Sequence, residues 1–88
     1  MIGNEWNLTK RKNIKEHIPD FWLINSSNEF APVECKLYSF DKAALNQLER
    51  YMKVYNCNFG IAVANTLDVK LPNNIKFISF DISDLTNF

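Results

Sequence analysis

The alternation of hydrophobic and polar positions predicts a hairpin in the first half of the chain. Its first arm spans residues 14–25, and its second arm covers residues 32–37. Between them lies the polar turn Asn25–Glu29, whose side chains are types that hydrogen-bond their own backbone. A weaker alternation over residues 5–9 predicts a short strand before the hairpin. The first half therefore reads as three strands.

Residues 41–56 carry the pattern of one amphipathic helix. Asp41 is a suitable N-cap, and Asn56 is a suitable residue at which the helix stops. The apolar side chains at helical spacing are Ala44, Leu48, Tyr51, Met52 and Tyr55. Their shared face predicts packing of this helix against a sheet.

Two further strands are predicted after the helix. The continuous apolar run over residues 58–65 is typical of a buried central strand, and residues 75–80 form the last strand. A helix between the second hairpin arm and the apolar run favours a right-handed crossover between parallel strands. We expect the acidic tail, residues 81–88, to fray or to cap the sheet edge. The prediction is an α/β fold in the order strand, strand, strand, helix, strand, strand.

Composition limits the organisation to one small domain over residues 1–88. A hydrophobic fraction of 47% is enough for a core, although a domain this short buries little of its surface, which favours a homodimer or a partner chain. Ten basic and ten acidic residues give a net charge of zero, which argues against a histone-like nucleic-acid binder but allows a local basic patch. We find no membrane-length apolar run and no secretory signal, and therefore expect a cytoplasmic, intracellular protein.

Several common kinds of catalytic site have no matching residues. The two glycines, Gly3 and Gly60, cannot form a glycine-rich phosphate loop. The single histidine, His17, precludes a zinc-ligand cluster and leaves a catalytic triad without a partner set. The two cysteines, Cys35 and Cys57, lack metal-ligand spacing.

Three charged residues stand in the otherwise apolar hairpin. If the arms fold about Ser27, Asp20 lies opposite Glu34, whereas a register shifted by one residue would separate the two carboxylates. Lys36 shares a strand face with Glu34. Two carboxylates suit Mg²⁺ or Mn²⁺, and a neighbouring ammonium can help an attacking water. A salt bridge between the arms explains the same residues, so both interpretations stay open on spacing alone.

The wider pattern resembles the PD-(D/E)XK nuclease superfamily, which includes restriction endonucleases, Holliday-junction resolvases and RecB-like exonucleases. It consists of the Pro19–Asp20 pair, the Glu34–Lys36 segment and a helix with Gln47 and Tyr51 four positions apart. The resemblance covers roughly residues 18–64. It implies a restriction-endonuclease-like core, with a mixed sheet of about five strands and one main helix.

The resemblance also implies chemistry. Asp20 and Glu34 would bind Mg²⁺ or Mn²⁺ together with the backbone carbonyl of Cys35. Lys36 would be the catalytic lysine of a divalent-metal-dependent nuclease that hydrolyses the phosphodiester bonds of DNA. Cys35, the variable middle residue of the motif, is expected to point into the core.

Two further groups would position DNA. Gln47 and Tyr51 match the helix motif that, in RecB-like members, helps to position the active site and DNA. The basic turn at Lys10, Arg11 and Lys12 would contact phosphates if a nucleic-acid site lies nearby, and is otherwise a solvated turn.

One departure from the superfamily bears on activity. Many members have an earlier helix with an additional acidic residue, but the seventeen residues before Ile18 do not read as a helix. Glu5 or Glu16 could supply a third carboxylate. The alternatives to a nuclease are a catalytically silent binding or assembly module, a fragment that another chain completes, and an unrelated α/β interaction domain in which Asp20 and Lys36 form a salt bridge.

Overall fold

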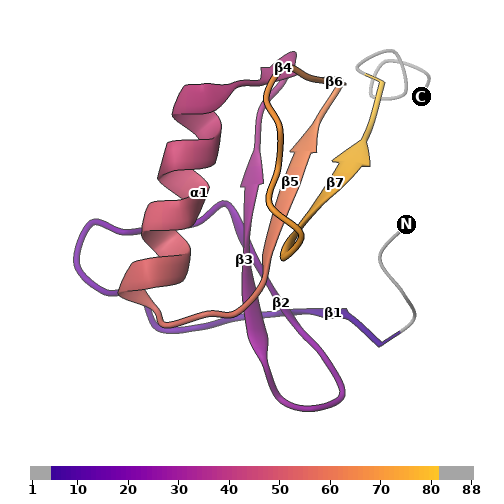
Figure 1. The fold of residues 1–88 in the computed structure, drawn as a ribbon. Coiled ribbons are helices and arrows are strands. Elements are labelled where there is room, and N and C mark those ends of the chain that lie inside the picture. Colours follow the sequence, from indigo (N-terminus) through magenta and orange to yellow (C-terminus); the bar gives the residue numbers. More distant parts are fainter. Residues whose placement is uncertain (1–4, 82–88) are drawn as a thin grey trace, which may run out of the picture.

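The computed structural model describes residues 5–81 as a five-stranded sheet with one helix against one face (Figure 1). The strand order in the sheet is β1-β2-β3-β5-β7, and β4 and β6 form a separate pair. In chain order the elements are β1 (Asn7–Thr9), β2 (Phe21–Ile24), β3 (Phe30–Cys35), β4 (Ser39–Phe40), α1 (Lys42–Val54), β5 (Gly60–Ala64), β6 (Thr66–Leu67) and β7 (Ile75–Ser79).

The sheet is mixed, which confirms the predicted α/β class. β1, β2 and β3 pair antiparallel, whereas β3, β5 and β7 pair parallel. The parallel connection from β3 through α1 to β5 is the predicted crossover. β5 lies between β3 and β7, and most of its residues are buried, as its unbroken apolar run predicts.

The turn between β2 and β3 sets the register of the hairpin. The Asn25 side-chain oxygen accepts hydrogen bonds from the backbone N–H groups of Ser27, at 3.0 Å, and Glu29, at 2.8 Å. In the strands Phe21 pairs with Val33, so Asp20 and Glu34 both lie next to this pair, and the Asp20 N–H donates to the Val33 carbonyl. The hairpin therefore folds about Ser27, and the predicted register is confirmed.

Helix α1 begins and ends at the predicted signals. The Asp41 side chain accepts a hydrogen bond from the Ala44 N–H at 3.0 Å, which satisfies one free donor of the first turn. Tyr55 caps the other end, and Asn56 adopts φ 54°, the left-handed conformation that stops a helix. The helix is shorter at each end than the predicted span 41–56.

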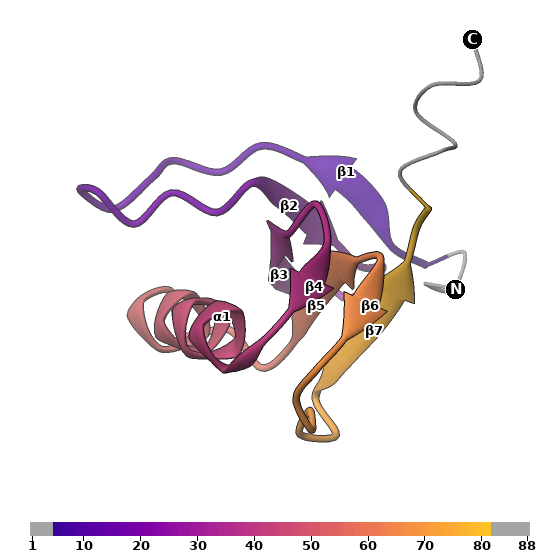
Figure 2. The ribbon, with the colours of Figure 1, turned by 90° about the horizontal axis from the view of Figure 1, so that it is seen from above.

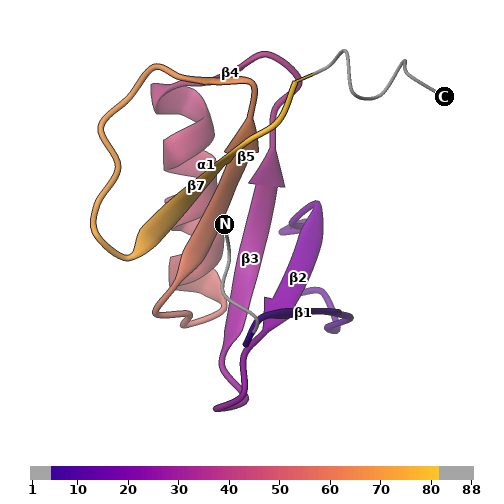
Figure 3. The same ribbon diagram turned by 90° about the vertical axis from the view of Figure 1, so that its right-hand side faces the viewer.

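The core lies on both faces of the sheet. Between α1 and the sheet, Phe40 and Leu48 are fully buried against Ala62. Figures 2 and 3 show α1 covering this face of β3 and β5. A second cluster, on strand positions of the other face, consists of Leu23, Ala31, Val33 and Ile61. The half-buried Cys35 packs against this second cluster.

The first hairpin arm differs from the prediction. Residues 14–25 were expected to be one strand, but β2 covers only residues 21–24, and residues 14–17 form a turn with an isolated bridge between Ile14 and His17. As expected, residues 5–17 contain no helix. The short strands β4 and β6 were not predicted, and most of the tail, residues 82–88, lies outside the described residues. In residues 5–81 we find no helix with the length and hydropathy of a membrane span.

An aromatic cage around Arg11 holds the segment before β2 against the end of α1. The Arg11 guanidinium lies 5.1 Å from the ring centre of Trp22, 4.7 Å from that of Phe30 and 5.1 Å from that of Tyr55. One guanidinium nitrogen also lies 3.6 Å from Cys57 Sγ. Cation–π contacts of this kind strengthen when the cation is partly removed from water.

The hydroxyl of Tyr55 adds hydrogen bonds to the same segment. It accepts from the backbone N–H of Ile14 at 2.8 Å and donates to the carbonyl of His17. Residues 10–17 do not pair with a strand of the sheet, so their backbone groups need other partners. The Tyr55 hydroxyl satisfies two of these groups, which favours a loop over a longer strand here.

We predict that Arg11→Ala lowers the free energy of unfolding by about 1–2 kcal/mol, because three aromatic rings lose their cation. Lys12→Ala is the matched control, since Lys12 is exposed and is expected to change stability by less than about 0.5 kcal/mol. Urea denaturation followed by far-UV circular dichroism measures both variants. Equal stabilities for the two variants would show that the cage does not stabilise the fold.

Candidate functional site

The end of β3 brings the two predicted carboxylates together. The backbone N–H of Cys35 donates a hydrogen bond of 2.7 Å to Asp20 Oδ2, so the side chain just before β2 reaches across to β3. The Asp20 N–H, in turn, donates to the carbonyl of Val33 at 3.1 Å. The Asp20 and Glu34 carboxyl groups lie within hydrogen-bonding reach of each other. The predicted pair is thus one site.

Glu34 is unusual because it is the only charged residue that is buried among residues 5–81, with 6% of its surface exposed. Burial raises the pKa of the Glu34 carboxyl, the negative charge of Asp20 raises it further, and Lys36 opposes this shift. A negative charge on Glu34 is therefore unfavourable in the free protein. A cation bound between the two carboxylates would favour the charged form.

Lys36 lies beside Glu34. Its Nζ is 3.6 Å from Glu34 Oε2, and its side chain is 46% exposed. The Lys36 N–H continues the β3–β5 ladder with a bond of 2.8 Å to the carbonyl of Val63. An unrelated interaction domain was expected to have a salt bridge between Asp20 and Lys36. In the structure Lys36 pairs with Glu34 instead. Only the lysine of this pair is exposed, so water weakens the attraction while the burial of Glu34 remains unfavourable.

A cavity of about 420 Å³ lies next to this site, between the end of β3 and α1. Its lining consists of Glu34, Lys36, Ser39, Asp41, Ala43, Ala44, Gln47 and Tyr51. Four of these residues were predicted as site residues from the sequence. The cavity therefore brings the strand motif and the helix motif together.

Tyr51 connects the helix to the carboxylates. Its hydroxyl donates a hydrogen bond of 3.1 Å to the carbonyl of Ile18, two residues before Asp20, and it also bonds the side chain of Gln47. Burial raises the pKa of Tyr51, the bond to Gln47 opposes this shift, and the charge of Glu34 adds to the rise. The phenol therefore stays protonated near neutral pH and can donate hydrogen bonds.

A divalent cation at this site would draw on few protein ligands. Within residues 5–81 there is no group of three histidine, cysteine or acidic side chains that could hold a metal ion. Glu5 lines a different pocket with Trp6 and Phe59, and Glu16 lies exposed in the loop before β2. Asp20 and Glu34 supply the hard oxygen atoms that Mg²⁺ prefers, and Mg²⁺ commonly keeps several waters beside one or two carboxylates. The donor set fits such an ion.

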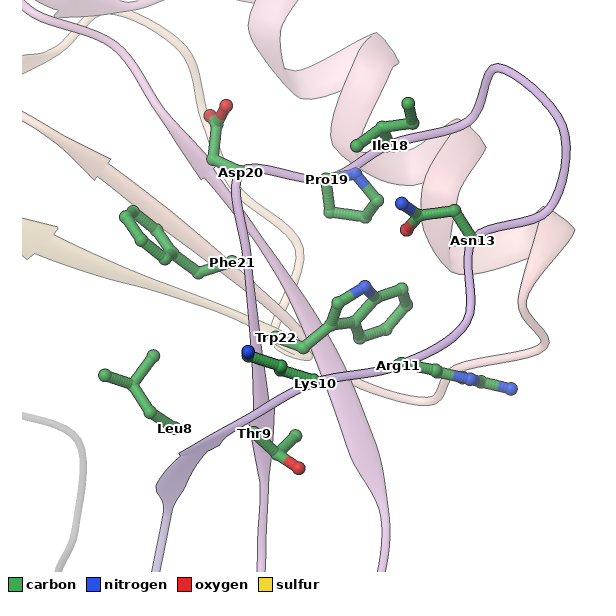
Figure 4. A pocket seen from close by; sticks show the side chains of 10 residues that line it. All are labelled: Leu8, Thr9, Lys10, Arg11, Asn13, Ile18, Pro19, Asp20, Phe21 and Trp22. Atoms are coloured by element: carbon green, nitrogen blue, oxygen red, sulfur yellow. The ribbon is translucent and has the colours of Figure 1, made fainter.

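The three residues of the basic turn have different surroundings. Lys10 and Lys12 are exposed, but the Arg11 cation lies in the aromatic cage. None of the three lines the cavity at Glu34. Lys10 and Arg11 instead line a neighbouring pocket that includes Asp20 (Figure 4). Contact between this turn and phosphate stays a prediction. Lys10 and Lys12 could make this contact while Arg11 stays in the aromatic cage.

The cavity also contains two polar residues that were not expected there. Asp41 was predicted only as a helix cap, and one of its oxygens does cap the helix, but the residue also lines the cavity. Ser39 lines it too and donates a hydrogen bond to Asp68. Neither residue belongs to the recognised motif, and β4, which carries Ser39, had no clear hydrophobic pattern. The one available signal was their position in the chain, since both residues lie within five positions of Lys36.

Comparison with known proteins gives one result that bears on the fold. No family model and no curated protein sequence matches the chain. Among solved structures, the chain is similar to that of a repair endonuclease from Pyrococcus abyssi, with a TM-score of 0.66 and 22% identity over 86% of this chain. The match spans 38% of that protein, so this chain corresponds to well under half of its length.

The likeness confirms the fold that the sequence motifs implied. The mixed five-stranded sheet, the single helix and the parallel β3–α1–β5 crossover are the features of a restriction-endonuclease-like core. An identity of 22% carries no residue role from one protein to the other, so those roles depend on the geometry described above. The chain therefore has a restriction-endonuclease-like fold.

Proposed function

We propose that this protein is a divalent-metal-dependent nuclease that hydrolyses phosphodiester bonds in DNA. The observation that carries the proposal is the Asp20–Glu34 pair at the end of β3, with Lys36 beside it and the Gln47–Tyr51 helix face next to it. The similarity in fold to a repair endonuclease supports the same class of reaction.

Each residue of the site would have its own role in the reaction. Asp20, Glu34 and the Cys35 carbonyl would hold Mg²⁺ or Mn²⁺, which supplies Lewis-acid polarisation of the phosphate and a more acidic water. Lys36 has three N–H donors beside the carboxylates, so it would orient the attacking water and offset negative charge on the phosphate. Gln47 and Tyr51 would position the site, since Tyr51 holds the backbone at Ile18.

A second candidate is a catalytically silent DNA-binding or assembly module, or a domain that another chain completes. It is supported by the absence, among residues 5–81, of a group of three histidine, cysteine or acidic side chains that could hold a metal ion. The match to 38% of a longer nuclease chain points the same way. In this case the fold and the cavity would be kept, and cleavage would require additional ligands from a partner.

The first test is cleavage of plasmid and single-stranded DNA with Mg²⁺ or Mn²⁺. We expect metal-dependent cleavage, which Lys36→Ala reduces at least about 100-fold because charge on the phosphate is no longer offset. Lys70→Ala, at an exposed lysine that does not line the cavity, is the matched control and should cleave normally. Cleavage that persists in Lys36→Ala would refute the assigned site, and DNA binding without cleavage would favour the silent module.

The second test uses the raised pKa of Glu34. Because the folded-state pKa lies above the usual value of 4.5, this group contributes its full stability below that value and loses it as pH rises through the folded-state pKa. Glu34→Gln should therefore raise the Tm of the metal-free protein at pH 7. Mg²⁺ or Mn²⁺ should raise the Tm of the wild type at that pH, and leave the Tm of Glu34→Gln unchanged.

Glu49→Gln is the control for these Tm measurements, since Glu49 is an exposed carboxylate on α1. It should respond to the metal as the wild type does. A metal-induced increase in the Tm of Glu34→Gln, equal to that of the wild type, would show that the ion binds elsewhere.

A further inference from the structure

A second pocket adjoins the carboxylate pair. This side pocket, lined by residues 8–11, 13 and 18–22, has a volume of about 560 Å³. It lies where two chain segments diverge beyond the last β1–β2 pair, which joins Thr9 to Trp22 (Figure 4). Asp20 belongs both to the lining of this pocket and to the candidate metal site. Its volume is typical of pockets that hold small molecules.

The walls of the side pocket are apolar and open to solvent. Leu8, Ile18 and Phe21 expose 73%, 55% and 53% of their surfaces. Single exposed apolar residues are normal, but here three of them line one pocket. They would lose their contact with water if a flat apolar group entered.

Trp22 forms a fourth part of the wall and gives an independent indication of a ligand. The residue is only 5% exposed, yet its Nε1–H is a buried donor without a hydrogen-bond partner in the described chain. Buried polar groups are nearly always paired, because an unpaired one is unfavourable. A ligand that carries an acceptor into this pocket would have a donor available in its wall.

Charge at the rim restricts the ligand further. Lys10 follows the last β1–β2 pair directly and lines the same pocket as Phe21, so a cation lies beside the apolar wall. The opposite end of the pocket is Asp20, where the metal would bind. A nucleotide strand matches this order, with an apolar base between two phosphates. An uncharged apolar peptide would leave both Lys10 and the metal site without a partner.

We propose that the side pocket binds an unpaired nucleobase next to the phosphate held at Asp20 and Glu34. The inference rests on the proposed nuclease function and names its substrate class, which is single-stranded or locally splayed DNA. The pocket walls would contact the two faces of the base. In a duplex the neighbouring bases cover these faces, so a stacked base could not enter the pocket. Lys10 would bind the phosphate on the far side of that base.

The test measures DNA binding without cleavage. Fluorescence anisotropy with Ca²⁺, which also takes oxygen ligands, compares a labelled single-stranded oligonucleotide with the blunt duplex of the same sequence. We expect the single strand to bind more tightly. Phe21→Ala should weaken binding of the single strand about tenfold, because one stacking contact is lost, and should leave duplex binding unchanged.

Two variants separate stacking from loss of structure. Phe21→Tyr keeps an aromatic ring at the same position and should bind the single strand as the wild type does. Leu67→Ala removes an exposed apolar side chain that does not line the side pocket, and it too should bind normally. In a Trp6→Phe background, Trp22 is the remaining tryptophan, and its fluorescence should change when the single strand binds.

The outcomes are distinguishable. Equal binding of single strand and duplex, no binding of the single strand, or wild-type binding by Phe21→Ala would overturn the base pocket. If Phe21→Ala cleaves single-stranded DNA at the wild-type rate, the base pocket would be refuted but the proposed nuclease function would stand. The expected binding pattern without any metal-dependent cleavage would refute the nuclease and keep the pocket. A dimer by light scattering that Phe21→Ala dissociates, without single-strand preference, would mean that a second copy occupies this surface.

Discussion

The register of the β2–β3 hairpin is the constraint on which the site depends. The side chain of Asn25 fixes the turn, and the turn pairs Phe21 with Val33, so that Asp20 and Glu34 both lie next to this pair. A shift by one residue would move one carboxylate to the other face of the sheet. The bond from the Cys35 N–H to Asp20 then draws this carboxylate to the end of β3. A local turn thereby determines the distance between two groups fourteen residues apart.

Burial of one member of the pair gives the site its chemical character. Glu34 lies under α1 and the neighbouring strands, which raises its pKa, whereas Asp20 and Lys36 are open to solvent. Such an arrangement is unfavourable in a purely structural ion pair, since an exposed lysine compensates a buried carboxylate poorly. The same arrangement suits an incoming cation. Burying the Glu34 carboxylate destabilises the free protein, and this is the physical reason to interpret the Asp20–Glu34 pair as functional.

The loop before β2 contributes more than the basic surface expected from its sequence. Arg11 lies against three aromatic rings, and Tyr55 and Tyr51 bond the backbone on both sides of that loop. The bond from Tyr51 holds the backbone two residues before Asp20. The contacts of the loop also leave Lys10 and the apolar side pocket facing solvent next to the candidate metal site.

The sequence by itself determined the order of the main elements, the ends of α1 and the grouping of Asp20, Glu34 and Lys36, because periodicity, caps and turn residues act over short separations. It could not show the Arg11 cage, the strands β4 and β6, or Asp41 in the cavity. Each of these depends on residues that are distant along the chain, such as Arg11 and Cys57. The pairing of Lys36 with Glu34 and the depth at which Glu34 is buried were likewise decided by tertiary packing, since burial is a property of the neighbours that surround a side chain and not of its own position in a pattern.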